Sequence, residues 1–436
     1  MIPAKDVPSV LERHVLVSEL DLVVDLARSH GATLVEARTG AAYLDFATFA
    51  GSLPLGMNHP AMAADEEFTR ALTVAALHKI TNPDFHTREY ASFVATFARV
   101  LGDPALPRLF FVDGGALAVE NAVKTAFDWK WRTSGTDPEH LVVMHLTDAF
   151  HGRSGYTLSL TNTEPVITDG YPQWEWPRLP TPGVRHPLAE FAQANEAADA
   201  RALQHAEQFF VDHPDRVACF IAEPIQGAAG DTHLSARFLR GMQELCRTHG
   251  ALLVLDEVQT GCGITGTPWL YQQLGLTPDL VAFGKKTQVC GVMAGERVTR
   301  APGNTFAAAG RIGSTWGGNT VDMVRATRIL DIIEEAGLIR HAARAGALLL
   351  SLVEELAARH PALVSNPRGR GLLCAFDLPD GTVRNRVLAE LRTGHHVLLL
   401  GGGDRAVRFR PSLAVTEDDL RKGIAAVDAV LSGRTG

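Results

Sequence analysis

The chain has 436 residues, of which 46% are hydrophobic and 21% charged, as is typical of a soluble globular enzyme with a large core. This length exceeds that of one typical domain, so two lobes are expected. The formal net charge is −8 and the basic residues form no block, which argues against nucleic acid and membrane surfaces as partners.

The amino-terminal stretch MIPAKDVPSVLERH has no apolar core of signal-peptide length. No stretch approaches the roughly 18 uninterrupted apolar residues of a membrane span. The five cysteines are scattered, odd in number and without a C-x-x-C pair: Cys219, Cys246, Cys262, Cys290 and Cys374. These features predict buried, reduced thiols and a cytoplasmic protein.

Residues 1–60 form an entry segment that we expect to contribute to the smaller lobe. Glu19–Arg28 has a helical spacing of apolar residues, although its valine pair also suits a strand. Thr33–Arg38 and Ala41–Phe46 flank a Thr-Gly turn, which predicts a hairpin.

From about residue 61 to 320 strands alternate with helices, which predicts a domain with a parallel sheet. Its first clear strand is Arg108–Val112, followed by Asp-Gly-Gly-Ala at 113–116 and a long helix over Leu117–Arg132. Small residues at a strand-to-helix junction let the backbone approach a phosphate, and the helix amino terminus adds free N–H groups. Two glycines at such a junction are also an ordinary turn.

The next strand, Leu141–His145, is followed by Phe150, His151, Gly152 and Arg153. Phe150 could stack on a ligand or pack in the core. Arg153 could bind a carboxylate with two parallel hydrogen bonds or form a surface salt bridge. The loop YPQWEWPRL at 171–179 is rich in Trp and Pro, and it suits either a substrate tunnel or an interface.

The most informative stretch is 251–286, where two short apolar runs each deliver a polar residue. Ala251–Leu255 delivers Asp256, and Leu280–Phe283 delivers Gly284 and then Lys285. Such runs are typical of buried parallel strands, whose carboxyl ends hold the ligand sites of open α/β sheets.

An acid and a lysine at neighbouring strand ends suggest pyridoxal 5'-phosphate (PLP) chemistry. The lysine amine would form a Schiff base with the aldehyde, and the acid would keep the pyridine nitrogen protonated. Taken singly, the lysine is more simply a solvated surface residue, and Asp256 with Glu257 also suits a magnesium-binding pair. No G-x-x-x-x-G-K-[ST] loop accompanies that pair, which argues against a nucleotide site. Cys290 is more simply a packing residue than a nucleophile.

Residues 321–436 predict a second, smaller domain. Two amphipathic helices, Asp322–Glu335 and Ile339–Arg359, precede strands at Leu372–Leu378, Val397–Leu400 and Val407–Phe409. Thr416, followed by Glu417, Asp418 and Asp419, predicts the cap of the last helix.

Taken together, D-E-V-Q-T-G … P-D … F-G-K resembles the class III (ω-) aminotransferases of PLP fold type I, over nearly the whole chain. The resemblance implies an α/β fold with a mostly parallel central sheet, helices on both faces and a smaller α+β carboxyl-terminal domain. Three stretches resemble members that act on the ε-amine of lysine: 171–179, AFGKKTQVCGVMAG at 282–295 and STWGGN at 314–319.

The resemblance implies a role for each matching residue around the cofactor. Lys285 would hold PLP, Asp256 would face the ring nitrogen, Val258 would pack under the ring, and Gln259 would bind the 3'-hydroxyl. Phe150 would stack on the ring from the aromatic-His-Gly position.

The family's phosphate cup, S-G-[ST]-E-A, is altered here. Gly114, Ala116 and Leu117 stand where Ser, Ser/Thr and Glu are usual, so the backbone N–H groups of Gly115 and Ala116 must hold more of the phosphate. Thr315 corresponds to a threonine that reaches the phosphate of the neighbouring subunit in relatives. The resemblance therefore implies a homodimer with shared sites.

Two arginines are the expected carboxylate ligands. Arg153 would bind the α-carboxylate of lysine, and Arg408, preferred over Arg410, would bind that of glutamate or 2-oxoglutarate. Relatives commonly read E-P-[IV]-Q-G-E, and the final glutamate pairs with the arginine at the position of Arg408. Here that glutamate is replaced by Ala228.

The resemblance thus implies transfer of the ε-amino group of L-lysine to 2-oxoglutarate. The products would be L-glutamate and a semialdehyde that cyclises to piperideine-6-carboxylate. One alternative is a class III enzyme for ornithine, 4-aminobutyrate or another ω-amine, because a fold does not determine a substrate. Another is a non-catalytic PLP-binding scaffold, which the retained Asp256, Gln259 and Lys285 argue against.

Overall fold

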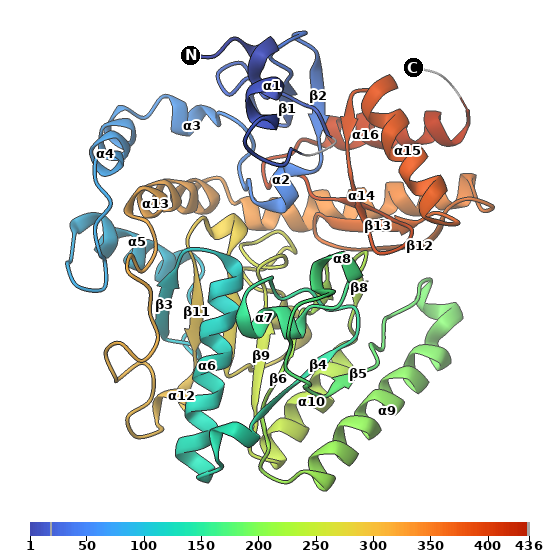
Figure 1. Cartoon of the computed structure of the whole chain (residues 1–436). Helices are drawn as coiled ribbons and strands as arrows, with labels where there is room; N and C mark the ends of the chain where they lie inside the picture. Colours follow the sequence, from blue (N-terminus) through green and yellow to red (C-terminus); the bar gives the residue numbers. More distant parts are fainter. Residues whose placement is uncertain (18–19, 434–436) are drawn as a thin grey trace.

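A computed structural model describes residues 1–17 and 20–433, and its centre is a seven-stranded sheet ordered β3-β11-β10-β9-β6-β4-β5 (Figure 1). The strands are β3 (Arg108–Val112), β4 (Val142–Leu146), β5 (Arg178–Leu179), β6 (Val217–Ala222), β9 (Leu252–Asp256), β10 (Leu280–Phe283) and β11 (Cys290–Ala294). β11 is antiparallel to both of its neighbours, and the other strands share one direction. The predicted mostly parallel sheet is confirmed, and β11 is an element that the sequence patterns did not indicate.

Helices cover both faces of this sheet. Successive side chains of a strand point to opposite faces, so an entirely apolar strand needs a covering helix on each side. In β9, Leu252 and Val254 belong to the core cluster that contains the apolar side of α6 (Gly115–Ser134). Leu253 and Leu255 belong to the cluster that contains α10 (Ala236–Thr248). The strand therefore has no solvent face, which agrees with its unbroken apolar sequence.

The carboxyl-terminal part is built on an antiparallel sheet ordered β12-β13-β16-β15. Its strands are β12 (Ser365–Arg370), β13 (Leu373–Asp377), β15 (Leu400–Gly402) and β16 (Ala406–Phe409). Another strand of this part, β14 (Val397–Leu398), pairs with the predicted hairpin of β1 (Thr33–Val35) and β2 (Ala42–Asp45). The amino-terminal segment and the carboxyl-terminal part thus share one small sheet.

The remaining elements are helices, 3₁₀ turns and the hairpin β7 (Ile225–Gln226) with β8 (Thr232–His233). They are η1 (Ala4–Asp6), α1 (Val7–Glu12), α2 (Thr48–Gly51), α3 (Pro60–Ala63), α4 (Glu66–Ala76), α5 (Arg88–Val100), η2 (Pro138–His140), α7 (Gly155–Leu160), α8 (Pro165–Thr168), α9 (Leu188–Asp212), α11 (Leu270–Leu274), η3 (Lys285–Thr287), α12 (Glu296–Thr299), α13 (Thr320–Glu335), α14 (Leu338–Arg359), α15 (Gly381–Gly394) and α16 (Glu417–Leu431). The predicted cap of α16 is confirmed, since the Asp419 N–H donates to the Thr416 hydroxyl at 3.1 Å.

The helix considered over Glu19–Arg28 is absent from the part that the structure describes. Residue 19 lies outside the described residues, and from Leu20 to Arg28 the chain forms turns and one isolated bridge, Val24 with Glu36. The apolar residues there pack against the β1–β2 hairpin, so their spacing reflects that contact and not a helix.

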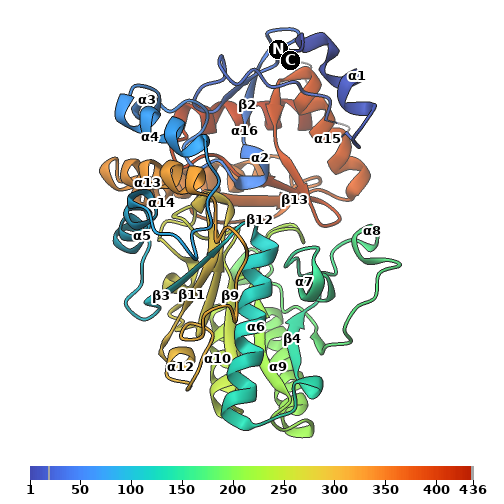
Figure 2. The ribbon, with the colours of Figure 1, turned by 60° about the vertical axis from the view of Figure 1, so that its left-hand side comes forward.

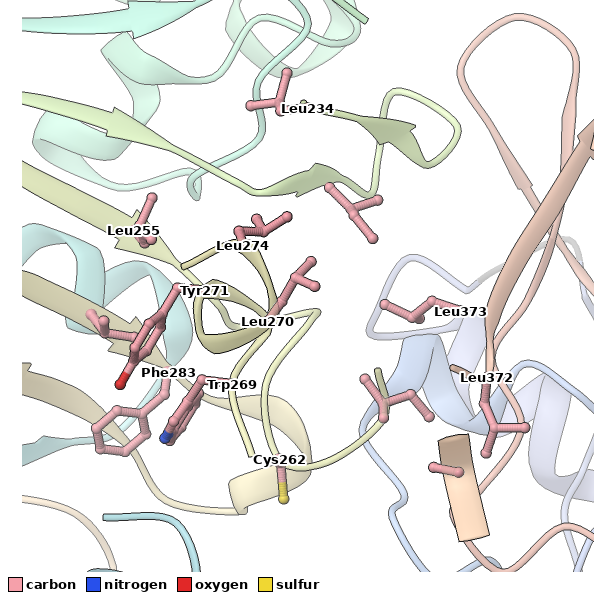
Figure 3. Close-up of a cluster of buried hydrophobic side chains, with 14 of the residues drawn as sticks. Leu234, Leu255, Cys262, Trp269, Leu270, Tyr271, Leu274, Phe283, Leu372 and Leu373 are labelled. Carbon is pink, nitrogen blue, oxygen red and sulfur yellow. The ribbon is translucent and has the colours of Figure 1, made fainter. Parts of the chain in front are cut away.

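One continuous core joins the large sheet to the carboxyl-terminal part. Figure 3 shows Trp269, Tyr271 and Phe283 on one side, with Leu372 and Leu373 across from them. Helix α13, which the sequence predicts to begin the smaller domain, packs on α4 and α5 of the larger one (Figure 2). The predicted domain boundary near residue 320 therefore stays a prediction. Within the described residues no single helix is long and apolar enough to cross a membrane. The bent pair of α13 and α14, taken together, resembles a membrane span in length and composition only.

Candidate active site

Asp256 and Lys285 lie at the carboxyl ends of two neighbouring parallel strands. Asp256 ends β9 and pairs in register with Ala282 of β10, three residues before Lys285. Lys285 has a φ of +53°, a backbone conformation that residues other than glycine rarely adopt. The sheet therefore brings the acid and the amine to one edge, as the strand pattern predicts.

The Asp256 carboxylate is held from behind by His151. The Nδ1 atom of His151 lies 2.9 Å from one carboxylate oxygen, and the other oxygen accepts the N–H of Val258 at 3.1 Å. Both side chains are buried, and Nε2 of His151 has no partner among the described residues. The carboxylate is thus fixed in direction, with limited contact with water.

Two adjacent lysines differ sharply in their surroundings. The amine of Lys286 donates to the carbonyls of Gln259 at 2.8 Å and Gly51 at 3.2 Å. Burial lowers the pKa of Lys286 to about 7. The amine of Lys285 has no hydrogen-bond partner among the described residues, and burial also lowers its pKa, against the charges of Asp256 and Glu223. Lys285 is therefore the amine that is free to react.

A single left-handed turn, labelled α2, lies between the large sheet and the carboxyl-terminal part (Figures 1 and 2). Thr48, Phe49 and Ala50 have φ values of 41°, 51° and 61°. Each such residue costs about 1–3 kcal/mol, so the surroundings must enforce the turn. Lys286 holds it by the Gly51 carbonyl, and the Thr48 hydroxyl donates to the Arg410 carbonyl at 2.6 Å.

The expected phosphate cup lies at the amino terminus of α6, a 20-residue helix whose first N–H groups have no helical acceptors. Gly114 precedes it with a φ of +101°, which accounts for glycine where relatives carry serine. A Cβ on Gly115 would meet Val258 at 3.3 Å, and one on Gly152 would meet Ala116 at 2.6 Å. The cup therefore packs closely against the loops that carry the other predicted site residues.

Phe150 and Arg153 follow β4 at the same edge of the sheet. The Phe150 N–H donates to Oε1 of Glu223 at 3.0 Å, which places Phe150 next to the end of β6. Arg153 is exposed on the single chain, with its guanidinium carbon 5.8 Å from the centre of the Phe150 ring.

The two carboxyl-terminal arginines are bound in different ways. Arg410 is buried and forms a two-pronged ion pair with Asp231. Arg408 donates to the carbonyls of Gly227 and Gly401, and no carboxylate of the described residues lies within ion-pair distance. Burial lowers the pKa of Arg408 to about 10. Arg408 is the arginine that can exchange its neutral partners for a substrate carboxylate.

Ala228 lies half-buried beside these contacts. It directly follows Gly227, and its carbonyl accepts the N–H of Gly403 at 2.8 Å. Backbone carbonyls therefore occupy the surroundings of Arg408 on both sides, where relatives place a carboxylate.

Gln259 also faces this site, and Thr315 lies in a separate, exposed loop. The Gln259 amide nitrogen reaches the Ala50 carbonyl at 3.4 Å, and its buried oxygen has no partner among the described residues. Thr315 is exposed in the loop before α13, which Asn82 anchors through the Trp316 and Gly318 carbonyls.

These residues fit PLP. The cup at the start of α6 suits a phosphate, Asp256 a ring nitrogen, and the reactive Lys285 amine an aldehyde. The unpartnered oxygen of Gln259 marks a buried polar position where a ligand hydroxyl would be accommodated. The donor set thus matches each polar group of the cofactor.

Sequence reasoning assigned no function to His151, Glu223 or Lys286. His151 and Asp256 are 105 residues apart, so no local pattern links them. The only signal was that His151 follows Phe150 in the aromatic-His-Gly motif. Lys286 has no motif of its own beyond its place next to Lys285, and the structure shows that it holds the left-handed turn through the Gly51 carbonyl.

Comparison with known proteins gives a consistent result. Residues 16–431 match the family described as aminotransferase class-III. The L-lysine-epsilon aminotransferase of Amycolatopsis lactamdurans is 56% identical over 99% of this chain and 96% of its own length. That of Streptomyces clavuligerus is 55% identical over 97% and 93%. The structure of a lysine aminotransferase from M. tuberculosis in the internal aldimine form has a TM-score of 0.96 and 53% identity, covering 99% of this chain and 100% of that chain.

Proposed function

The chain belongs to the class III aminotransferases, and on that premise we propose that it transfers the ε-amino group of L-lysine to 2-oxoglutarate. The observation that carries the proposal is the free Lys285 amine next to the fixed Asp256 carboxylate, in a chain 53–56% identical to lysine aminotransferases. PLP is its cofactor. When bound, PLP supplies an aldehyde for attachment of amines and a protonated ring that takes up electrons.

We assign the proton transfers at the reacting centre to Lys285 and Asp256. Burial favours the neutral amine of Lys285, which is the form needed to remove a proton from Cε of lysine. Asp256 would keep a proton on the ring nitrogen of the bound cofactor, and the contact with His151 fixes the direction of the Asp256 carboxylate.

The two arginines divide the carboxylates between them. Lysine presents methylenes at the reacting end, so its α-carboxylate would lie farther out, where we expect the exposed Arg153 to bind it. Glutamate and 2-oxoglutarate present a carboxylate close in, where Arg408 is held by carbonyls only. Charge-assisted bonds exceed neutral ones in strength, so a substrate carboxylate displaces those carbonyls.

A donor panel tests the substrate. The visible band of the bound cofactor should be lost on adding L-lysine, and more slowly with ornithine or 4-aminobutyrate. If the band is lost fastest with ornithine or 4-aminobutyrate, that amine and not lysine is the donor. If no amine removes the band, the protein is a non-catalytic scaffold.

We also propose a homodimer with shared sites, in the cytoplasm. Apolar side chains near the site are exposed on the single chain, including Phe49 at 48%, Leu117 at 40% and Trp316 at 41%. Mixing Lys285→Ala with Thr315→Ala chains tests the sharing. Random pairing should restore about a quarter of the sites, because a mixed dimer has one intact site. Activity no greater than the sum of the two parents would contradict it.

A further inference from the structure

Glu223 is a buried acid that directly follows β6 and binds two separate loops. Its Oε1 accepts the N–H of Phe150 at 3.0 Å, and its Oε2 accepts the N–H of Gly227 at 3.1 Å. These bonds use both oxygens, so the carboxylate has one fixed orientation. It joins the loop that follows β4 to the turn between β7 and β8.

Gly227 opens a tight turn that carries the partners of both arginines. The Gly227 carbonyl accepts the N–H groups of Gly230 at 3.1 Å and Asp231 at 3.3 Å, and also the guanidinium of Arg408. Asp231, at the end of the same turn, binds Arg410. The position of Gly227 therefore sets where the Arg408 guanidinium lies.

We propose that Glu223 is a positioning residue that holds Arg408 through Gly227 and thereby sets the affinity of the site for dicarboxylate substrates. This inference rests on the proposed function, in which Arg408 binds the carboxylate of 2-oxoglutarate and glutamate. Because the same carboxylate holds Phe150, Glu223 also links the ring end of the site to its carboxylate end.

A purely electrostatic role for Glu223 predicts the opposite effect. Its charge acts on Arg408 and raises the pKa of that guanidinium, although burial lowers it more. If charge were the whole effect, removing it would leave Arg408 more attractive to anions, and dicarboxylates would bind more tightly. A positioning role predicts weaker binding, because Gly227 and Arg408 would lose their fixed place.

The test measures binding of glutarate, a dicarboxylate that cannot react, to the PLP-loaded enzyme by calorimetry. An amide at position 223 can accept only one of the two N–H groups, so Glu223→Gln should raise the Kd at least roughly tenfold, the effect of one buried bond lost. Tighter or unchanged binding would overturn the proposal.

Glu257 provides a matched control. It is also buried, accepts the N–H groups of Leu270 at 2.8 Å and Tyr271 at 2.7 Å, and burial raises its pKa to about 7, as for Glu223. Its bonds hold α11 and not the turn that binds the arginines. Glu257→Gln should change the glutarate Kd less than about threefold. An equal weakening in both variants would mean a general loosening and would overturn the specific role.

Two further variants keep the inference open to refutation. Glu223→Asp retains the charge but is too short to reach both N–H groups, so it should weaken glutarate binding as well; wild-type affinity would contradict positioning. In a double-mutant cycle with Arg408→Lys, the two effects should be strongly non-additive, since Glu223 acts through Arg408. Additive effects would overturn that link.

Glutarate binding also separates this inference from the proposed donor. If the wild-type enzyme binds glutarate but its visible band persists when lysine is added, lysine is refuted as the substrate. The role of Glu223 is then still decided by the glutarate affinities of its variants. A wild-type enzyme that does not bind glutarate would overturn the inference itself.

Discussion

The imidazole of His151 lies 2.9 Å from the carboxylate of Asp256, and both side chains are buried. Such a pair holds a carboxylate in one direction while water is largely excluded. The acid that we expect to face the cofactor ring is therefore supported by a residue 105 positions away in the sequence.

Substitutions at these two positions should be graded in effect. Asp256→Asn removes the charge that keeps the ring nitrogen protonated, so turnover should fall by several orders of magnitude. His151→Gln leaves Asp256 in place and removes one buried bond, so turnover should fall roughly ten- to a hundredfold. Steady-state rates at matched PLP content measure both, and near-normal activity of Asp256→Asn would refute its role.

The adjacent lysines should separate chemistry from stability. Lys285→Ala should abolish turnover while PLP still binds through its phosphate and ring contacts. Lys286→Ala should lower the Tm, because the carbonyls of Gly51 and Gln259 lose their buried donor. Thermal unfolding and rate measurements on both variants suffice, and an active Lys285→Ala beside an inactive Lys286→Ala would reverse the assignment.

Lys286 should also make stability depend on pH. Burial lowers its pKa from 10.5 to about 7, so between these values the unfolded chain binds a proton that the folded chain does not. The contribution of this group to stability therefore rises with pH across that window. The Tm of the wild type minus that of Lys286→Met should increase from pH 7 to pH 9; a constant difference would mean that the amine stays charged when buried.

Much of this site was predictable because strand ends and short motifs are local signals. The edge shared by Asp256 and Lys285 follows from two apolar runs, and β3 has the predicted bounds. The bonds from His151 to Asp256 and from Glu223 to Gly227 are set by how loops from different strands meet, which no local pattern encodes.

The left-handed turn at Thr48–Gly51 was unpredictable for another reason. Thr, Phe and Ala all disfavour positive φ, so propensity points away from the observed conformation. Tertiary bonds from Lys286 and Thr48 outweigh that preference. In residues 20–28 the local pattern favours a helix that does not form, because the apolar side chains there pack on the β1–β2 hairpin instead.

Arg153 should matter only for donors with a distant carboxylate. Arg153→Ala should raise the apparent KM for lysine roughly ten- to a hundredfold, as expected for one charge-assisted contact of ~1.5–3 kcal/mol. Simple ω-amines without a carboxylate should be affected less. Its position over the Phe150 ring, at 5.8 Å, permits a structural role instead, and equal losses for both donor types would establish that role.

Ala228 stands where the E-P-[IV]-Q-G-E motif has its final glutamate. Arg408 is bound there by two carbonyls and keeps its charge, so α-carboxylates meet no competing anion. Lysine, which brings methylenes to this place, must leave the cation without a charged partner, and that is costly in a partly dry pocket. Amino acids with a free α-carboxylate should therefore compete with lysine as donors.

Ala228→Glu should correct this imbalance. A carboxylate one residue beyond Gly227 would pair with Arg408 during the lysine half-reaction and move aside for glutamate. We expect faster loss of the PLP band with lysine and a preference for lysine over glutamate increased roughly tenfold or more, the effect of one charge-assisted contact. Ala228→Gln, similar in size but uncharged, should leave that preference near the wild-type value. Single-turnover spectra with each donor decide the matter, and an unchanged ratio in Ala228→Glu would show that the carbonyls of Gly227 and Gly401 already satisfy Arg408.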